Sequence, residues 1–280
     1  MSHPPGLVRV SIHFRSFRSS SAGNCLALWT PDSSILIDCG VRTLRECRAL
    51  LRQHQDRHGP VDTVLVSHAH GDHFTRPALR ALEEEAIAIR GHRRVVAQLR
   101  ERHDAGRGTG SPIQPFPGDT FTVGDFRITA VPLPHAPDVP NFGFVVVAGH
   151  GEERRKIVVC TDFHDFSSVV PHLASADFVF LEANHDLDLL RRHPNPNSRY
   201  HLSNVKAAWL LYHAVRANHS VPGRVVLGHL SDERNREGLA LGEVARVFAR
   251  QGMRLDFELE AAPKFEPSRV IAVGRGRSVG

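Results

Sequence analysis

Short apolar runs alternate with segments of helical periodicity along most of the chain. Residues 34–38 (SILID) and 61–67 (VDTVLVS) are nearly continuous apolar runs, typical of strands that are buried on both faces. A helix is predicted over 76–85, because Thr75 is a suitable cap and Pro77 suits a first helical turn. Strands and helices that follow one another in this way predict an α/β fold.

The same alternation returns in the second half. A strand-rich stretch covers 121–131, and four apolar runs follow it, namely NFGFVVVAG, KIVVCTD, DFVFLEA and RVVLGHLS. Ser203 can cap a helix with apolar positions spaced by three and four, and another helix is predicted over 239–250. Residues 105–118 and 193–198 are predicted loops, and 275–280 a disordered tail, which leaves 1–274 as one domain. Two similar halves are consistent with two sheets packed face to face.

Composition and charge narrow the class of protein only slightly. The chain has 280 residues, of which 41% are hydrophobic, and a net charge of +5 that is spread along its length. This modest excess permits an acidic partner without indicating one. The first residues lack the apolar core of a signal peptide, and no apolar run approaches the length of about 18 that spans a membrane. A cytoplasmic protein without membrane contact is predicted, with all four cysteines reduced.

Three histidines and an aspartate crowd the turn VSHAHGDHF, which directly follows the apolar run at 61–67. A turn that only reversed the chain would need glycine and small polar residues. His68, His70, Asp72 and His73 are instead the nitrogen and oxygen ligands that Zn²⁺ and similar metals prefer. The spacing therefore predicts a metal site at this strand end.

Further ligands are expected where later strands end. His135, Asp162 and His229 follow such strands and bring the set to seven, and two metals need about six or seven protein ligands besides water. A carboxylate has two oxygens, so Asp162 can bridge two metals. His164 stands two residues after Asp162 and competes with His135, and spacing alone leaves this choice open.

Several motifs together resemble one family. SSSAGN, ILIDCG, HAHGDH, PHAPDVPNFGF, TDF, LEANHD, HLSN and HLSDERN are similar to the YycJ/WalJ group of the metallo-β-lactamase superfamily, related to the ribonuclease Z and cyclic-phosphodiesterase branch. The resemblance implies an αββα sandwich, in which two mixed sheets pack face to face with helices on the outer faces. It also implies two divalent ions, Zn²⁺ or Mn²⁺. The implied ligands are His68, His70 and His135 for one ion and Asp72, His73 and His229 for the other, with Asp162 as the bridge.

The resemblance adds residues around the metals. Glu182 and His201 match the order of a Glu-Ala pair and a histidine in ribonuclease Z-like proteins. His201 stands before the helix capped by Ser203, and the positive end of that helix would favour a phosphate oxygen. The alternative is that His201 makes only a hydrogen bond that closes the loop. Asp38 is expected to brace the loop or to bond a ligand histidine. Glu182, His185 and Asp186 are expected either to orient the site or to be structural.

The implied activity is a phosphodiesterase or nuclease that attacks nucleic-acid phosphodiesters with a hydroxide activated by two metals. Asp72 would orient the nucleophile, and His201 would protonate the leaving alkoxide. Nucleic acid or a small phosphodiester is the expected partner, and the Arg-rich stretch 90–107 either contacts phosphates or is a solvated helix face. Two alternatives remain, a metallohydrolase of thioesters, lactones or other carbonyl substrates and a metal-stabilised module that binds nucleic acid without cutting it.

Overall fold

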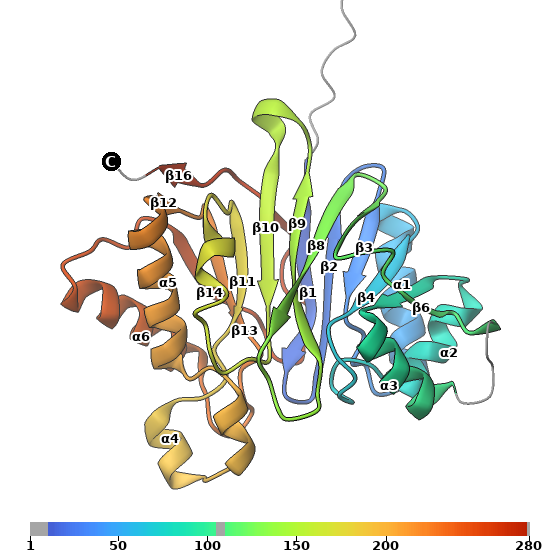
Figure 1. The fold of residues 1–280 in the computed structure, drawn as a ribbon, viewed down its shortest axis with the longest axis horizontal. Coiled ribbons are helices and arrows are strands. Elements are labelled where there is room, and N and C mark those ends of the chain that lie inside the picture. The colour runs from blue at the N-terminus through green and yellow to red at the C-terminus, as the bar shows by residue number, and fades with distance from the viewer. Residues whose placement is uncertain (1–10, 105–109, 279–280) are drawn as a thin grey trace, which may run out of the picture.

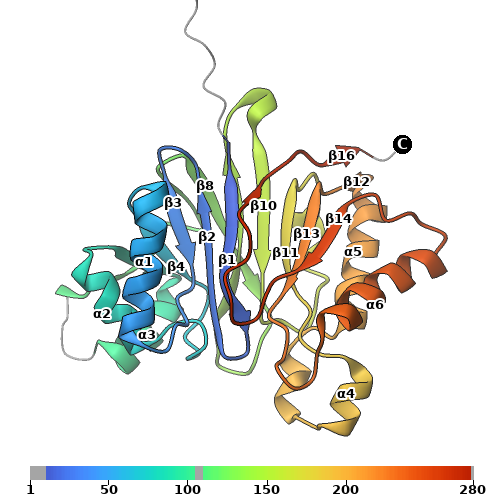
Figure 2. The same cartoon turned by 180° about the vertical axis from the view of Figure 1, so that it is seen from behind.

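Two seven-stranded β-sheets pack face to face in the computed structural model, which describes residues 11–104 and 110–278 (Figure 1). Helices lie on the outer side of each sheet, as Figure 2 shows from behind. The predicted αββα layering is therefore confirmed. The helices are α1 (Leu44–His58), α2 (Arg76–Glu84), α3 (Arg93–His103), α4 (Leu187–Arg192), α5 (Asn204–Asn218) and α6 (Glu237–Arg250).

The first sheet is antiparallel on one side and parallel on the other. Its order is β15-β1-β2-β3-β4-β5-β6, and the pairs from β3 to β6 are parallel. Helices α1, α2 and α3 cover its outer face. The strands are β1 (His13–Ser20), β2 (Gly23–Trp29), β3 (Ser34–Ile37), β4 (Thr63–Val66), β5 (Ala88–Gly91), β6 (Ile113–Pro115) and β15 (Ile271–Ala272).

The second sheet repeats this mixed pattern. Its order is β14-β13-β11-β10-β9-β8-β7, and the pairs from β10 to β14 are parallel. Helices α5 and α6 cover its outer face. The strands are β7 (Thr120–Val123), β8 (Phe126–Leu133), β9 (Asn141–Ala148), β10 (Arg155–Cys160), β11 (Phe178–Glu182), β13 (Arg224–Gly228) and β14 (Glu258–Ala261).

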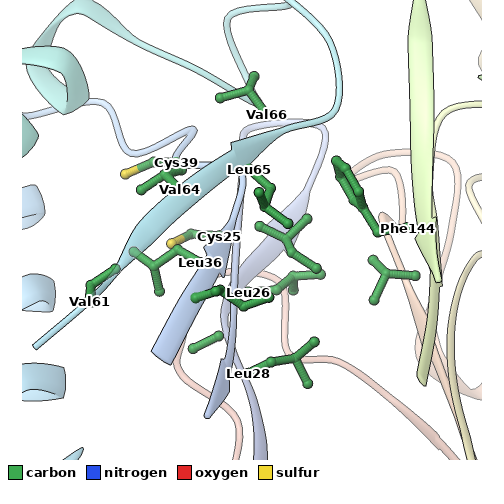
Figure 3. Close-up of a cluster of buried hydrophobic side chains, with 14 of the residues drawn as sticks. Cys25, Leu26, Leu28, Leu36, Cys39, Val61, Val64, Leu65, Val66 and Phe144 are labelled. Atoms are coloured by element: carbon green, nitrogen blue, oxygen red, sulfur yellow. The ribbon is translucent and has the colours of Figure 1, made fainter. Parts of the chain in front are cut away.

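Successive side chains along a strand point to opposite faces of its sheet, so one set packs between the two sheets and the other packs under the helices. In β4, Leu65 points toward Phe144 of the opposite sheet, whereas Val64 points toward the helices (Figure 3). Phe14 of β1 lies 4.6 Å from Phe178 of β11, between ring centroids, and so joins the two sheets. Each such buried side chain contributes about 1.5–3 kcal/mol to folding. All four cysteines are buried and free, as predicted.

The predicted caps Thr75 and Ser203 are confirmed, the helix predicted over 239–250 begins at Glu237, and two predicted irregular segments are wrong. The hydroxyls of Thr75 and Ser203 accept hydrogen bonds from the first turns of α2 and α5. Part of the predicted loop 105–118 is strand β6, which pairs with β5, while 105–109 lie outside the described residues. Part of the predicted disordered tail is β16 (Arg277–Ser278), which pairs with β12 (Ser220–Val221). Backbone pairing stabilises both segments without an apolar pattern of their own. Residues 279–280 are not described.

No helix among residues 11–104 and 110–278 has the length and apolar character that crossing a membrane requires.

Candidate metal centre

Side chains that follow strands of both sheets meet at one end of the sandwich, where the C-terminal ends of β4, β8, β10 and β13 lie. This end faces α4 in Figure 1. Asp38, Asp162 and His229 follow β3, β10 and β13 with φ angles of 60°, 60° and 53°. This left-handed conformation is uncommon outside glycine and turns the chain sharply. The turns bring strand-end side chains together over the edge of the sheets.

Three histidines form a first cluster that could hold a metal. His70 Nδ1 lies 3.0 Å from His68 Nε2 and 3.3 Å from His135 Nε2. Ligands of a tetrahedral zinc ion are about 3.3 Å apart, given zinc–nitrogen distances near 2.05 Å. Burial lowers the pKa of His68, and it lowers that of His70 to about 4. These imidazoles are therefore neutral at pH 7, as metal ligation requires.

Two carboxylates and two histidines form a second cluster. His229 Nε2 lies 3.3 Å from Asp72 Oδ2, and His73 Nε2 lies 3.0 Å from Asp162 Oδ2. Asp162 Oδ2 is buried, and its contact with His73 Nε2 lacks the geometry of a hydrogen bond. Burial lowers the pKa of His229, but Asp162 and the other nearby carboxylates outweigh this and raise it to about 10. The carboxylates therefore favour a positive charge here, and the residues fit a divalent cation.

Histidines of both clusters are oriented by contacts of the ring nitrogen that points away from the cluster. A metal-binding histidine usually bonds an oxygen through its other ring nitrogen, which fixes the orientation of the ring. Four of the clustered histidines make such a contact. The pairs are His68 Nδ1 with Ser67 Oγ (3.0 Å), His73 Nδ1 with Asp38 Oδ2 (2.7 Å), His135 Nδ1 with the Tyr200 carbonyl (3.1 Å) and His229 Nδ1 with Glu182 Oε1 (2.9 Å).

Asp38 joins the loop after β3 to the loop after β4. Besides its contact with His73, it accepts a hydrogen bond from the Ser67 backbone at 2.8 Å. The next loop residue but one, Gly40, lies so close that a Cβ there would be 1.8 Å from the Asp72 carbonyl oxygen. Asp38 thus contacts a clustered histidine directly, in addition to bracing the loop.

Glu182 supports a second pair of histidines from the end of β11. Its Oε1 lies 2.7 Å from His201 Nδ1 and 2.9 Å from His229 Nδ1, and its Oε2 accepts two backbone hydrogen bonds. Burial lowers the pKa of His201, but the Glu182 carboxylate outweighs this and raises it. Because Nδ1 of His201 is occupied, Nε2 is the nitrogen left to meet a substrate.

A cavity of about 540 Å³ opens over the clusters. His70, Asp72, Asp162 and His201 are among the residues that line it. One further part of its wall comes from the 3₁₀ turn Pro196–Tyr200, and another from residues 231–234. Through this cavity a substrate can reach the potential metal-binding side chains of both sheets.

All seven predicted ligands lie in these two clusters, and His135 rather than His164 is beside His70. A third possible cluster of the described residues joins Asp162 and His229 to Glu182 and His201. Two other predicted residues support the fold near the site instead. Ser203 caps α5, and His185 is buried with its carbonyl bonded to the Asn204 backbone. His164 lies nearby, where its carbonyl accepts a hydrogen bond from Lys206. Among the described residues, none of these three belongs to a possible metal cluster.

Buried asparagines around the site were missed by sequence reasoning. Asn24 bonds the Asp72 carbonyl, Asn141 bonds the Asp162 carbonyl and Asn184 bonds the His229 carbonyl. Asn204 and Asn235 bond each other through both side-chain amides. The available signal was that all five stand in the strand-end motifs that carry the family resemblance. They hold the backbone of the loops that present the ligands.

Helix α3 lies within the Arg-rich stretch 90–107, of which 105–107 are outside the described residues, and the face of this helix is not simply solvated. Arg102 donates to the Ala69 carbonyl, inside the loop that carries His68 and His70. Arg100 donates to the Ile113 carbonyl. These two arginines brace the first sheet, so they do not extend freely toward a phosphate.

Comparison with known proteins assigns the family. Residues 33–230 match the family model described as a beta-lactamase superfamily domain. The chain therefore belongs to the beta-lactamase superfamily, and its two sheets and outer helices have the metallo-β-lactamase fold.

Particular relatives are more informative. The chain is 24% identical over 272 residues to exodeoxyribonuclease YycJ of Bacillus anthracis, covering 93% of this chain and 99% of that protein. The crystal structure of YhfI from Bacillus subtilis is similar, with a TM-score of 0.69 at 20% identity, covering 94% of this chain and 99% of that one. Human tRNase Z, short form, has a TM-score of 0.60 at 17% identity, covering 94% and 99%.

Proposed function

We propose that this protein is a metal-dependent phosphodiesterase that cuts nucleic acid, with DNA as its substrate. The position of His201 carries this proposal. Its ring is held by Glu182 at 2.7 Å, beside Asp162 and inside the cavity. A nucleotide alkoxide leaves poorly unless it is protonated, whereas the thiolate of a thioester does not need a proton donor. The name of the YycJ relative supports DNA as the substrate.

The two clusters would hold two divalent ions, with His68, His70 and His135 around one and Asp72, His73 and His229 around the other. Asp162 would bridge them. Such a pair supplies a hydroxide nucleophile near neutral pH and neutralises charge on the phosphate. Asp72 would orient the nucleophile, because its Oδ2 lies close to both His73 and His229 and its side chain reaches the cavity.

His201 protonates the departing oxygen. Glu182 stabilises the protonated ring and fixes Nδ1, so the proton moves from Nε2. Asn184 and Asn141 hold the backbone behind the clusters and keep their side chains in position.

A digest of end-labelled substrates tests the proposal. The protein is stripped with a chelator, reloaded with Mn²⁺ or Zn²⁺, and given labelled DNA, labelled RNA and a thioester. We expect cleavage of DNA by the metal-loaded protein and none by the stripped protein. Hydrolysis of the thioester without cleavage of either nucleic acid would contradict the proposal and favour carbonyl chemistry. Saturable DNA binding without cleavage would favour a binding module.

Replacing Glu182 by glutamine is expected to weaken metal binding by about tenfold or more. A glutamine amide can accept through only one of its two end atoms. It therefore cannot take hydrogen bonds from both histidines and from both backbone amides that Glu182 now serves. The measurement is competition for metal with a chromogenic chelator.

Asp38→Asn is the matched comparison, because Asp38 holds His73 in the same cluster from the opposite side. We expect it to weaken metal binding to a similar extent. Glu84→Gln is the control that should leave metal affinity unchanged. Glu84 is on α2 and forms an exposed ion pair with Arg48 of α1. Unaltered metal affinity in both Glu182→Gln and Asp38→Asn would mean that these carboxylates do not orient ligands.

A further inference from the structure

Tyr200 occupies a distinctive place at the wall of the cavity. Its carbonyl accepts from Nδ1 of His135 at 3.1 Å, and its ring meets the His135 ring edge-on at 6.3 Å. The next residue is His201. The Tyr200 side chain is only partly buried and lines the cavity. Its ring is thus fixed beside the reacting centre without belonging to either cluster.

Arg199 extends this aromatic surface. Its guanidinium carbon lies 4.6 Å from the centroid of the Tyr200 ring, and one of its nitrogens donates to the Tyr200 hydroxyl at 2.6 Å. Arg199 is exposed. Within the described part of the chain no carboxylate pairs with it, so its charge is available to a ligand. The guanidinium lies over the Tyr200 ring, so the two side chains form a stacked pair that carries a positive charge.

The backbone keeps this pair in place. Tyr200 ends the 3₁₀ turn Pro196–Tyr200, which Asn195 caps by accepting from the Asn197 backbone. Ser198 inside the turn is buried, and its carbonyl accepts from the His201 backbone at 3.2 Å. The anchored turn fixes the backbone of Tyr200, and the hydrogen bond from Arg199 to its hydroxyl restrains the ring. Such restraint lowers the entropy lost on binding.

We propose that Arg199 and Tyr200 form a stacking platform for the nucleobase of the nucleotide next to the scissile phosphate. The inference rests on the proposed nuclease function. Bases stack on aromatic rings and on guanidinium planes whatever their sequence, because every base has a π-face. A phosphate placed at the metal clusters carries its base toward the cavity wall, to which Tyr200 contributes. The platform binds substrate and has no part in the proton transfer.

The test compares two short oligomers of equal length and charge, thymidylate pentamer and a pentamer of abasic tetrahydrofuran residues. For the native protein we expect the KM of the abasic pentamer to be about tenfold higher or more. Tyr200→Leu should raise the KM of the thymidylate pentamer by a similar factor. It should leave the abasic pentamer unchanged, with kcat and metal content little altered. Tyr200→Phe should remain close to the native protein.

Phe265→Leu is the matched control, because Phe265 is an exposed aromatic residue that lines a different cavity, with Phe17 and Leu50. It should change neither KM. Fluorescence anisotropy of the same labelled pentamers reports binding whether or not they are cut. Equal losses of affinity on both pentamers in Tyr200→Leu, or no loss on either, would overturn the platform. Absence of cleavage by the native protein, with base-dependent binding retained, would instead count against the nuclease function alone.

Discussion

Replacing Asp162 by alanine is expected to reduce the metal bound per chain from about two ions toward one or none, and to slow turnover by about 10³-fold or more. Asp162 is buried, with one oxygen 3.0 Å from His73 Nε2 and the other 3.5 Å from His229 Nε2. Removing it deletes the proposed bridge and much of the negative charge that favours a cation there. The measurements are metal content by plasma mass spectrometry and turnover of labelled DNA.

Asp165→Ala is the control for this variant. Asp165 lies in the same loop, but its carboxylate is exposed and accepts hydrogen bonds from the backbone and hydroxyl of Ser167. It should keep two ions and full activity. Circular dichroism should show both variants folded. Two retained ions and native turnover in a folded Asp162→Ala protein would refute the bridging role.

Replacing His201 by alanine is expected to slow turnover of a nucleotide diester by about 10²-fold or more. For an aryl diester such as bis-p-nitrophenyl phosphate, the loss should be about tenfold or less, equivalent to about 1.4 kcal/mol. The phenolate leaves without a proton, whereas the alkoxide needs one. The Glu182 carboxylate, 2.7 Å from Nδ1, supports the protonated ring that this role requires. Single-turnover rates on both substrates measure the difference.

Metal content separates this role from ligation, since His201→Ala should keep its ions. His164→Ala is the matched control, because this nearby histidine is outside the possible metal clusters of the described residues and should leave both rates unchanged. An equal loss on the two diesters, with metal retained, would mean that His201 positions the phosphate or the loop. The general-acid assignment would then be withdrawn.

Local patterns predicted the parts of the fold that depend on neighbouring residues. The strands around 34–37 and 63–66 and the caps Thr75 and Ser203 follow from apolar runs and single side chains. Helix α1 was not predicted, because only Cys47, Leu51 and His54 of its fifteen residues are buried and the remainder are mostly charged or polar. Strands β6 and β16 were missed because they form by pairing with β5 and β12.

The sequence by itself determined the family resemblance, the layered fold and the identity of the ligand-type residues. Four of these residues stand within one stretch of six positions, 68–73, so their chemistry is visible without the fold. Only the tertiary structure decided which acceptor orients each histidine. The contacts of His73 with Asp38, His229 with Glu182 and His135 with Tyr200 join residues 35, 47 and 65 positions apart. Spacing along the chain cannot specify such contacts, because they depend on strand order and on how two sheets meet at one edge. For the same reason the sequence left open whether His135 or His164 completes the first cluster. Tyr200 could be placed at the cavity wall only from the tertiary structure.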